Sequence, residues 1–236
     1  MTFEELKAMD ETYVMHTYGR FPVDIDHGEG ATLYSLSGRK YIDFTSGIGV
    51  NSLGYANPQW IAAITAQIAK LGHISNLFYT QPGALLAKEL CTRSGMSKVF
   101  FGNSGAESNE AMIKVARKYS FDKYGKGRST IITLNRSFHG RTITTLTATG
   151  QDSYHNYFFP FNEAFRYADP TLESIQAQAG DDVCAVMVEL IQGEGGLNPL
   201  DKAMVQALAA LCRENDWLLL MEGKLKNAKQ ELYRDL

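Results

Sequence analysis

The feature that most restricts the fold is an alternation of strand-like and helix-like segments in the second half of the chain. The strand-like runs are 130–134, 163–167, 183–191 and 217–221, and the helix-like segments are 172–179 and 201–215. Because a strand followed by a helix usually returns to the sheet in the same direction, this order predicts an α/β fold with a mostly parallel sheet and helices on both faces. Ligands of such sheets bind beyond the carboxyl ends of the strands.

A strand, a turn and a helix are also predicted around FFGNSGAESNEAMIKVAR, residues 100–117, where the strand covers 98–101. Ser104 is a typical N-cap residue, and the amides of Gly105 and Ala106 at the helix N-terminus can bind an anion, for which phosphate is the natural candidate. An ordinary capped turn has the same local pattern. The segment lacks the GK[ST] ending of a P-loop and the three glycines of a dinucleotide-binding fingerprint.

The N-terminal part predicts helices and a small β element outside the main sheet. Two alternating runs, 32–36 and 40–44, flank Gly38, which is typical of a hairpin. Three segments have the pattern of a helix, and these are 2–17, 58–71 and 82–94.

Composition and charge restrict the class of function. The chain has 236 residues, a net charge of −3 and a pI near 6.0, and its apolar runs fall short of the roughly 20 residues that span a membrane. We therefore expect a soluble, cytoplasmic protein without an export signal, which binds neither nucleic acid nor a membrane. Cys91, Cys184 and Cys212 lie far apart in apolar segments, so buried thiols are expected, and no histidine or cysteine spacing indicates a metal site.

Three loops are expected to converge in one crevice at the carboxyl edge of the sheet, and these are 102–104, 137–141 and 192–196. Phe138 offers a flat face to an aromatic cofactor, and Arg141 offers a guanidinium suited to a carboxylate. Glu189 would be costly to bury without a positive partner. Each residue also has an ordinary interpretation, as a core phenylalanine, a surface arginine and a strand-end carboxylate.

The blocks FFGNSGAESNEAMIKVAR, RSFHGRT and VELIQGEGG occur in this order, and the chain thereby resembles the class III pyridoxal-phosphate aminotransferases, above all the acetylornithine aminotransferases. The runs LYSLSGRKYIDFTSGIGVNSLGYANP and SNLFYTQP fit the same family, and the resemblance covers about residues 10 to 221. It implies the large domain of pyridoxal-phosphate fold type I, with pyridoxal 5'-phosphate as cofactor. By resemblance, the cofactor-binding residues are Ser104, Gly105, Ala106, Phe138, His139 and Glu222, and the substrate-binding residues are Tyr18, Arg141, Glu189 and Glu194.

The resemblance also implies roles for these residues. The amides at the helix N-terminus would bind the cofactor phosphate, Phe138 would stack on the pyridine ring, and Arg141 would receive a substrate carboxylate. Glu189 would lie beside the ring and the substrate. Glu194 would be a gating carboxylate that pairs with an arginine from farther along the family's chain.

The implied reaction moves an amino group from a small-molecule donor to the cofactor and then to 2-oxoglutarate, in a ping-pong cycle. The donor stays open among N-acetylornithine, ornithine, succinylornithine and 4-aminobutyrate. The family builds its active site at the interface of a homodimer, with SNLFYTQP near the partner's site.

After residue 221 the sequence departs from the family pattern. The family continues with an Asp-Glu-Val-Gln block and later with the Schiff-base lysine, whereas here Glu222 stands at the aspartate position and GKLKNAKQELYRDL follows. Lys224, Lys226 and Lys229 belong to a charged, helix-like run. We therefore assign no catalytic residue and expect this chain alone not to transaminate. The alternative is a non-catalytic chain that binds the cofactor or pairs with a complete subunit.

The expected organisation has three parts. They are an N-terminal arm with a small β element in residues 1–52, an incomplete cofactor-binding large domain in 53–221, and a tail in 222–236 that does not match the family.

Overall fold

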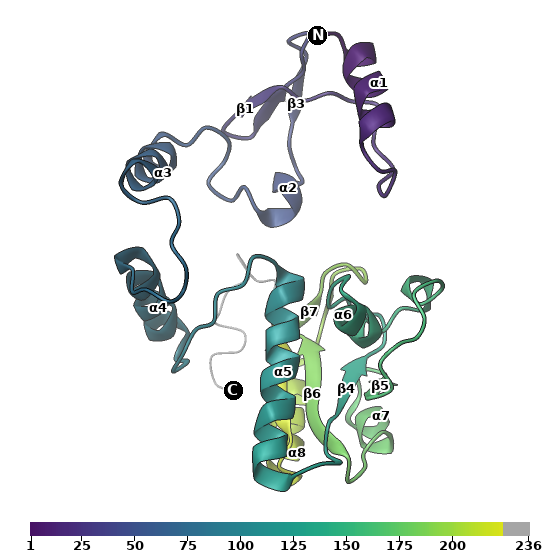
Figure 1. Ribbon diagram of the computed structural model, residues 1–236. Coiled ribbons are helices and arrows are strands. Elements are labelled where there is room, and N and C mark those ends of the chain that lie inside the picture. Colours follow the sequence, from purple (N-terminus) through teal and green to yellow (C-terminus); the bar gives the residue numbers. More distant parts are fainter. Residues whose placement is uncertain (224–236) are drawn as a thin grey trace. The chain divides into compact units, whose positions relative to one another are not determined.

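The computed structural model describes residues 1–223 and divides into two compact units, Met1–Leu86 and a second unit from Ala87 onward (Figure 1). The three-part organisation expected from the sequence stays a prediction. The tail residues Lys224, Lys226 and Lys229 lie outside the described residues. No helix within residues 1–223 is long and apolar enough to span a membrane.

The first unit contains a three-stranded antiparallel sheet and short helices. Strand β2 pairs with both β1 and β3, and Thr32 lies opposite Ile42. This pairing confirms the predicted hairpin, whereas β1 has no alternating pattern and was not predicted. The elements are α1 (Phe3–Tyr13), β1 (His27–Glu29), β2 (Thr32–Tyr34), β3 (Lys40–Ile42), α2 (Ser46–Gly49) and α3 (Pro58–Lys70), and α4 (Gln81–Ser94) crosses the boundary between the units.

Local capping signals set the ends of these helices. Thr2 and Glu5 form a capping box at the start of α1, and the side chain of Asn57 accepts a hydrogen bond from the N–H of Trp60 at the start of α3. Helix α1 ends earlier than predicted because Val14 has an extended backbone, with φ −107° and ψ 131°.

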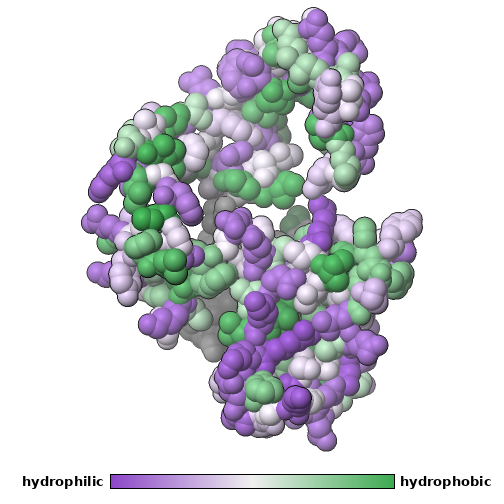
Figure 2. All heavy atoms as spheres, viewed as in Figure 1, coloured by the Kyte–Doolittle hydropathy of each residue, from purple (hydrophilic) through white to green (hydrophobic). Residues whose placement is uncertain are grey.

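The apolar stripe of α3 lies at the surface. No residue of α3 is buried, and the exposed fraction is 55% for Trp60 and 64% for Ile68. Figure 2 shows hydrophobic side chains over this helix. The predicted helix is therefore confirmed, and its apolar stripe is not covered within the described residues.

The second unit is built on four parallel strands in the order β5-β4-β6-β9. They are β4 (Thr130–Leu134), β5 (Phe165–Ala168), β6 (Val183–Glu189) and β9 (Leu218–Glu222), and a separate hairpin consists of β7 (Ile191–Gln192) and β8 (Asn198–Pro199). Strand β6 is buried along its whole length, which is typical of a central strand in a parallel sheet. The parallel sheet predicted from the sequence is confirmed.

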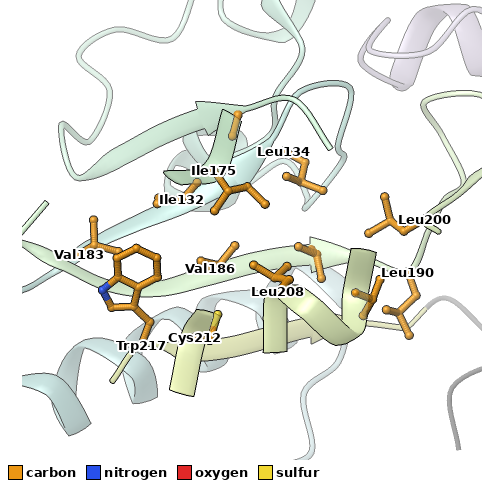
Figure 3. Close-up of a cluster of buried hydrophobic side chains, with 13 residues drawn as sticks. Ile132, Leu134, Ile175, Val183, Val186, Leu190, Leu200, Leu208, Cys212 and Trp217 are labelled. Carbon is orange, nitrogen blue, oxygen red and sulfur yellow. The ribbon is translucent and has the colours of Figure 1, made fainter. Parts of the chain in front are cut away.

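Helices cover both faces of this sheet. On one face, α7 (Leu172–Ala177) and α8 (Lys202–Glu214) contribute Ile175, Leu208 and Cys212 to a cluster with Ile132 and Val186 (Figure 3). On the other face, α5 (Gly105–Tyr124) and α6 (Ile143–Ala148) contribute apolar side chains to a second cluster with β4 and β6. Because the four strands are parallel, their carboxyl ends all lie at the same edge of this sheet.

The strand predicted for residues 98–101 is wrong. This segment leads into α5 without strand structure, and the side chains of Phe100 and Phe101 are exposed. A strand needs a neighbour that satisfies its backbone groups. No strand within residues 1–223 pairs with this segment, so its β-rich composition alone does not make it one.

The cysteine prediction is confirmed for two of the three thiols. Cys184 in β6 and Cys212 in α8 are buried, and Cys91 in α4 is partly buried. Burial raises the pKa of the Cys184 and Cys212 thiols to about 11. Both therefore stay protonated at neutral pH and serve as packing residues.

Asp182, just before β6, gives the fold a testable pH dependence. Its carboxylate accepts hydrogen bonds from Thr130 Oγ1 at 2.6 Å and from Arg166 Nη2 at 2.9 Å, and these contacts lower its pKa, the Thr130 bond most. A carboxyl with a lowered folded-state pKa stabilises the protein above its unfolded value, here 3.8, and this stability is lost as the pH falls.

We expect Asp182→Asn to lower the thermal midpoint at pH 6 by roughly 2–4 °C, since about 1 kcal/mol remains after solvent screening. The difference in thermal midpoint between Asp182→Asn and the wild type, measured by circular dichroism, should shrink as the pH falls from 5 to 3. A gap of the same size at pH 6 and pH 3 would show that the ionised carboxylate contributes nothing.

Candidate functional site

The candidate site lies at the carboxyl ends of β4, β6 and β9. The loop 135–142 begins where β4 ends at Leu134 and finishes at Thr142, the N-cap residue of α6. Its central residues contact the last residues of β6 and β9, so a single loop joins the ends of three strands.

Two acidic residues end neighbouring strands at this edge. Glu189 closes β6 and Glu222 closes β9, and the two are register partners. Glu189 is fully buried, and its Oε2 accepts a hydrogen bond from the backbone N–H of Phe138 at 2.9 Å. Oε2 of Glu222 lies 2.7 Å from Nδ1 of His139. Successive residues of one loop therefore hold both carboxylates.

Asn109 on α5 connects the elements of the site. Its Nδ2 donates to the carbonyl of His139 at 2.7 Å and to Oε2 of Glu222 at 2.9 Å, and only 4% of the residue is exposed. A carboxylate removed from water is costly unless it accepts such hydrogen bonds. Asn109 therefore ties α5 to the loop and to β9.

The ring of His139 is buried between these groups. Because a carboxylate only accepts, Nδ1 carries the hydrogen in the contact with Glu222. The other ring nitrogen, Nε2, is also buried and has no hydrogen-bond partner among residues 1–223, as is also true of Thr133 Oγ1. Most buried polar atoms are paired, so an orphaned nitrogen in the ring that contacts Glu222 is a reason to expect a bound polar group.

The N-terminus of α5 adjoins the same loop. Ser104 is its N-cap, and Oγ of Ser104 accepts from the N–H of Glu107 at 3.2 Å, as the sequence predicts. Gly140 has φ +134°, and a Cβ there would lie only 2.8 Å from Cβ of Ala106. Only glycine fits this close approach, which brings the first turn of α5 against the loop that carries Phe138.

Glu107 in the first turn of α5 has a carboxylate that is held by hydrogen bonds from two neighbouring side chains. Hydrogen bonds from Asn103 and Ser104 lower the pKa of Glu107. The ionised side chain complements the positive end of the helix dipole and caps the first turn.

The third predicted loop contributes Glu194. Its carboxylate accepts hydrogen bonds from Gln151 Nε2 at 2.6 Å and from the Tyr154 hydroxyl at 2.8 Å. The ring of Tyr154 lies 5.6 Å from that of Phe138, and the guanidinium of Arg141 lies 5.6 Å from the Phe138 centroid. The hydrogen bond to Glu194 raises the pKa of Tyr154, whereas Arg141 lowers it by a smaller amount.

The structure thus brings together nine of the ten residues singled out in the sequence, all in the second unit. They are Ser104, Gly105, Ala106, Phe138, His139, Arg141, Glu189, Glu194 and Glu222. Tyr18 lies in the first unit, where it lines a cavity of about 540 Å³ between α1 and residues 16–25. The functional role of each of the ten stays a prediction.

Three residues of the site were not singled out in the sequence. Asn109 lies inside a predicted helix, and its partner Glu222 is 113 positions away. Gln151 and Tyr154 follow α6 in a segment without a recognisable motif. Asn109 shares the buried face of α5 with Ile113, Ala116 and Ser120, so polarity alone does not single it out in the sequence.

These residues fit pyridoxal phosphate. The first N–H groups of an α-helix have no partners within the helix and suit a phosphate, and here they adjoin Gly140. Phe138 offers an aromatic face, and Glu222 offers a carboxylate that Asn109 and His139 orient. An anion site, a flat surface and a fixed negative charge are the features that such a cofactor requires.

The aminotransferase class-III family model matches residues 13–222. Acetylornithine aminotransferase from Haemophilus ducreyi is 52% identical over 224 residues, which cover 94% of this chain and 57% of that enzyme. The enzyme of the same name from Wolinella succinogenes is 46% identical over 218 residues, which cover 92% and 55%. The chain therefore spans about half the length of the curated relatives it matches.

Solved structures of aminotransferases are also similar to this chain. Ornithine aminotransferase from Toxoplasma gondii ME49 has a TM-score of 0.88 at 30% identity, covering 94% of this chain and 53% of that one. N-acetylornithine aminotransferase from Stenotrophomonas maltophilia K279a has a TM-score of 0.73 at 34% identity, covering 91% and 52%. The family match includes every residue of the site in the second unit, from Ser104 to Glu222, and the chain belongs to the class-III aminotransferases.

Proposed function

We propose that this protein is a pyridoxal-phosphate-dependent aminotransferase that transfers the amino group of N-acetylornithine to 2-oxoglutarate. The observation that carries the proposal is the meeting of Ala106, Phe138 and Glu222 at one edge of the parallel sheet. Family membership supports the reaction class, and the names of the curated relatives support the donor. The activity of the whole protein is part of the proposal, because the chain spans about half of those relatives.

In the proposed site, each cofactor group has its own residues. The amides of Gly105 and Ala106 hold the phosphate, supported by the dipole of α5. Phe138 stacks on the pyridine ring, and Glu222 faces the ring nitrogen. When bound, the cofactor supplies an electron sink that stabilises negative charge on the substrate carbon.

Glu222 occupies the position that the family resemblance gives to an aspartate. Its side chain is one methylene longer, so the carboxylate needs additional restraint to keep a fixed position. Asn109 and His139 both contact the same oxygen, Oε2, which defines the orientation of the group. We infer that this pair of contacts allows a glutamate to serve at this position.

Arg141 receives a substrate carboxylate in the proposed mechanism. Its planar guanidinium can donate two parallel hydrogen bonds, which a lysine cannot reproduce. Glu189 lies beside the ring and the substrate, and Glu194 acts as a gating carboxylate near Arg141. Tyr18 and the run SNLFYTQP complete the site in a homodimer.

The lysine that holds the cofactor covalently lies, we infer, outside the matched residues 13–222. Borohydride reduction in the presence of pyridoxal phosphate, followed by peptide mapping, tests this inference. We expect no lysine within residues 1–223 to be labelled to near one equivalent. Stoichiometric labelling of one such lysine would contradict the inference.

The reaction itself is tested by glutamate formation from 2-oxoglutarate with each of the four candidate amino donors. The protein is purified free of host aminotransferase, and pyridoxal phosphate without protein gives the background. We expect these 236 residues alone to stay at the background rate. We expect a full-length version, which carries the Schiff-base lysine of the family, to use N-acetylornithine fastest. A faster rate with ornithine or 4-aminobutyrate would overturn the proposed donor. No activity of the full-length version with any donor would favour a non-catalytic cofactor-binding chain.

A further inference from the structure

Glu110 in α5 contacts the residue that directly follows Arg141. Its Oε1 accepts a hydrogen bond from the hydroxyl of Thr142 at 2.5 Å. Both residues are partly buried, and Thr142 is the N-cap of α6. Hydrogen bonds that an ionised carboxylate accepts are stronger than those between neutral groups. This contact therefore ties the end of the loop that carries Arg141 to α5.

The Glu110 carboxylate also sets the direction of the hydrogen bonds in the cap of α6. Because a carboxylate only accepts, the single hydroxyl hydrogen of Thr142 goes to Glu110. The hydroxyl of Thr145, whose oxygen lies 2.7 Å from that of Thr142, is then the donor to Thr142. Thr145 Oγ1 in turn accepts from the backbone N–H of Thr142 at 3.2 Å. A charge on α5 therefore orders the cap and fixes the backbone of Thr142.

The backbone of Arg141 is held on both sides, whereas its side chain is exposed. Before it, Gly140 approaches the first turn of α5, where a Cβ would lie 2.8 Å from Cβ of Ala106. After it, Thr142 is bonded to the next turn of the same helix. The exposed guanidinium lies over the ring of Phe138, 5.6 Å from its centroid. The direction of this guanidinium therefore depends on where α5 holds the backbone of residue 141.

We propose that Glu110 and Thr142 are positioning residues that hold the backbone of Arg141 and thereby aim its guanidinium at a carboxylate of the ligand. The inference rests on the proposed function, in which Arg141 receives a substrate carboxylate. A guanidinium donates two parallel hydrogen bonds to a carboxylate only in a narrow range of orientations. Because Glu110 also raises the pKa of Arg117, changes at Thr142 give the cleaner test.

The first test measures the affinity of valerate, a monocarboxylate, for the full chain loaded with pyridoxamine 5'-phosphate, by ligand-observed NMR. We expect Thr142→Val, which keeps the shape of the side chain and removes its hydroxyl, to weaken valerate binding about five- to tenfold. Thr142→Ser keeps the hydroxyl and should stay within about twofold of the wild type. Adding Glu110→Leu to Thr142→Val should weaken binding no further, because both changes remove the same contact. In an Arg141→Leu background, Thr142→Val should have no effect on valerate binding.

Thr171→Val is the matched control for the loss of a helix cap. Thr171 caps α7, which has six residues like α6, and its side chain accepts from the N–H of Ser174 at 3.2 Å. Its replacement should leave valerate affinity unchanged. Equal losses in Thr142→Val and Thr171→Val would overturn the proposal, as would strictly additive losses in Thr142→Val and Glu110→Leu. If Thr142→Val does not fold, Glu110→Gln decides, since it keeps the shape without the charge: we expect about two- to threefold weaker binding, and wild-type affinity would overturn the proposal.

A second measurement separates this proposal from the proposed function. The Nε–Hε NMR signal of Arg141, identified by its absence in Arg141→Leu, is shifted by the ring of Phe138 beneath the guanidinium. Without cofactor or ligand, Thr142→Val should move this signal toward its position in Phe138→Leu, while Thr142→Ser and Thr171→Val should leave it in place. An unmoved signal in Thr142→Val overturns the positioning role. If valerate does not bind the wild type, or binds Arg141→Leu equally well, Arg141 is not the carboxylate receptor of the proposed function, and this signal still decides whether Thr142 positions it.

Discussion

Replacing Gly140 by alanine is expected to destabilise the folded protein by roughly 3 kcal/mol and to weaken cofactor binding at least about tenfold. The added methyl group would lie 2.6 Å from Thr145 Oγ1 and 2.8 Å from Ala106 Cβ, at a φ of +134° that disfavours any side chain. The loop must then move away from the first turn of α5, which separates Phe138 from the proposed phosphate site. Urea denaturation measures the stability, and titration with pyridoxamine 5'-phosphate measures the affinity.

Gly127→Ala is the matched control for backbone strain. Gly127 has φ +105°, but a Cβ there would meet no atom within 4 Å. We expect this change to cost about 1 kcal/mol and to leave cofactor affinity unaltered. Equal losses of affinity in the two variants would mean that the contact between Gly140 and Ala106 does not shape the site.

Asn109→Leu is expected to destabilise the protein by roughly 3 kcal/mol, because it removes the donor that the partly buried Glu222 carboxylate and the buried His139 carbonyl share. The donor contacts are 2.9 Å to Glu222 and 2.7 Å to His139. Leucine has the same branching as asparagine but is larger, so the loss combines the missing hydrogen bonds with some overpacking. Asn156→Ala, at an exposed residue whose amide donates to the nearby Ser153 carbonyl, should cost less than about 0.5 kcal/mol.

A double-mutant cycle assigns this loss to Glu222. In a Glu222→Gln background the carboxylate charge is absent, so Asn109→Leu should cost at least about 1 kcal/mol less than in the wild type. Urea denaturation of the four proteins gives the coupling directly. Strictly additive effects would show that Asn109 does not act through Glu222.

The sequence predicts well those parts of this fold that depend on local chemistry. The capped start of α5 follows from Ser104 and the glycine after it, and the buried strand β6 follows from its continuous apolar run. Their order along the chain then predicts a parallel sheet. The rule for ligand sites in such sheets places the loops after β4 and β6 at the carboxyl edge before any contact is known.

The parts that could not be predicted depend on distant partners. The run 98–101 has β-forming residues but no neighbouring strand within residues 1–223, so its composition misleads. Asn109 looks like any polar residue of a helix until β9 brings Glu222 to it. Tyr154 is equally ordinary until the loop after β7 brings Glu194 to its hydroxyl. Periodicity indicates which face of a helix is buried, but it does not identify what that face contacts.

In the proposed site the start of α5 binds the cofactor phosphate through backbone N–H groups, and Gly105→Pro tests this binding with little change in structure. Gly105 is the first residue of α5, a position where proline is well tolerated, and Ser104 before it already has an extended backbone with ψ 163°. Proline therefore removes one amide donor and preserves the helix. Gly105→Ala keeps the donor, and its methyl group has open space.

The measurement is a calorimetric titration of all three proteins with pyridoxamine 5'-phosphate, whose amine does not react with surface lysines. We predict one site per chain in the wild type, the same affinity in Gly105→Ala, and at least about tenfold weaker binding in Gly105→Pro. Equal affinity in all three proteins, or no saturable binding in the wild type, would contradict a phosphate site at the start of α5.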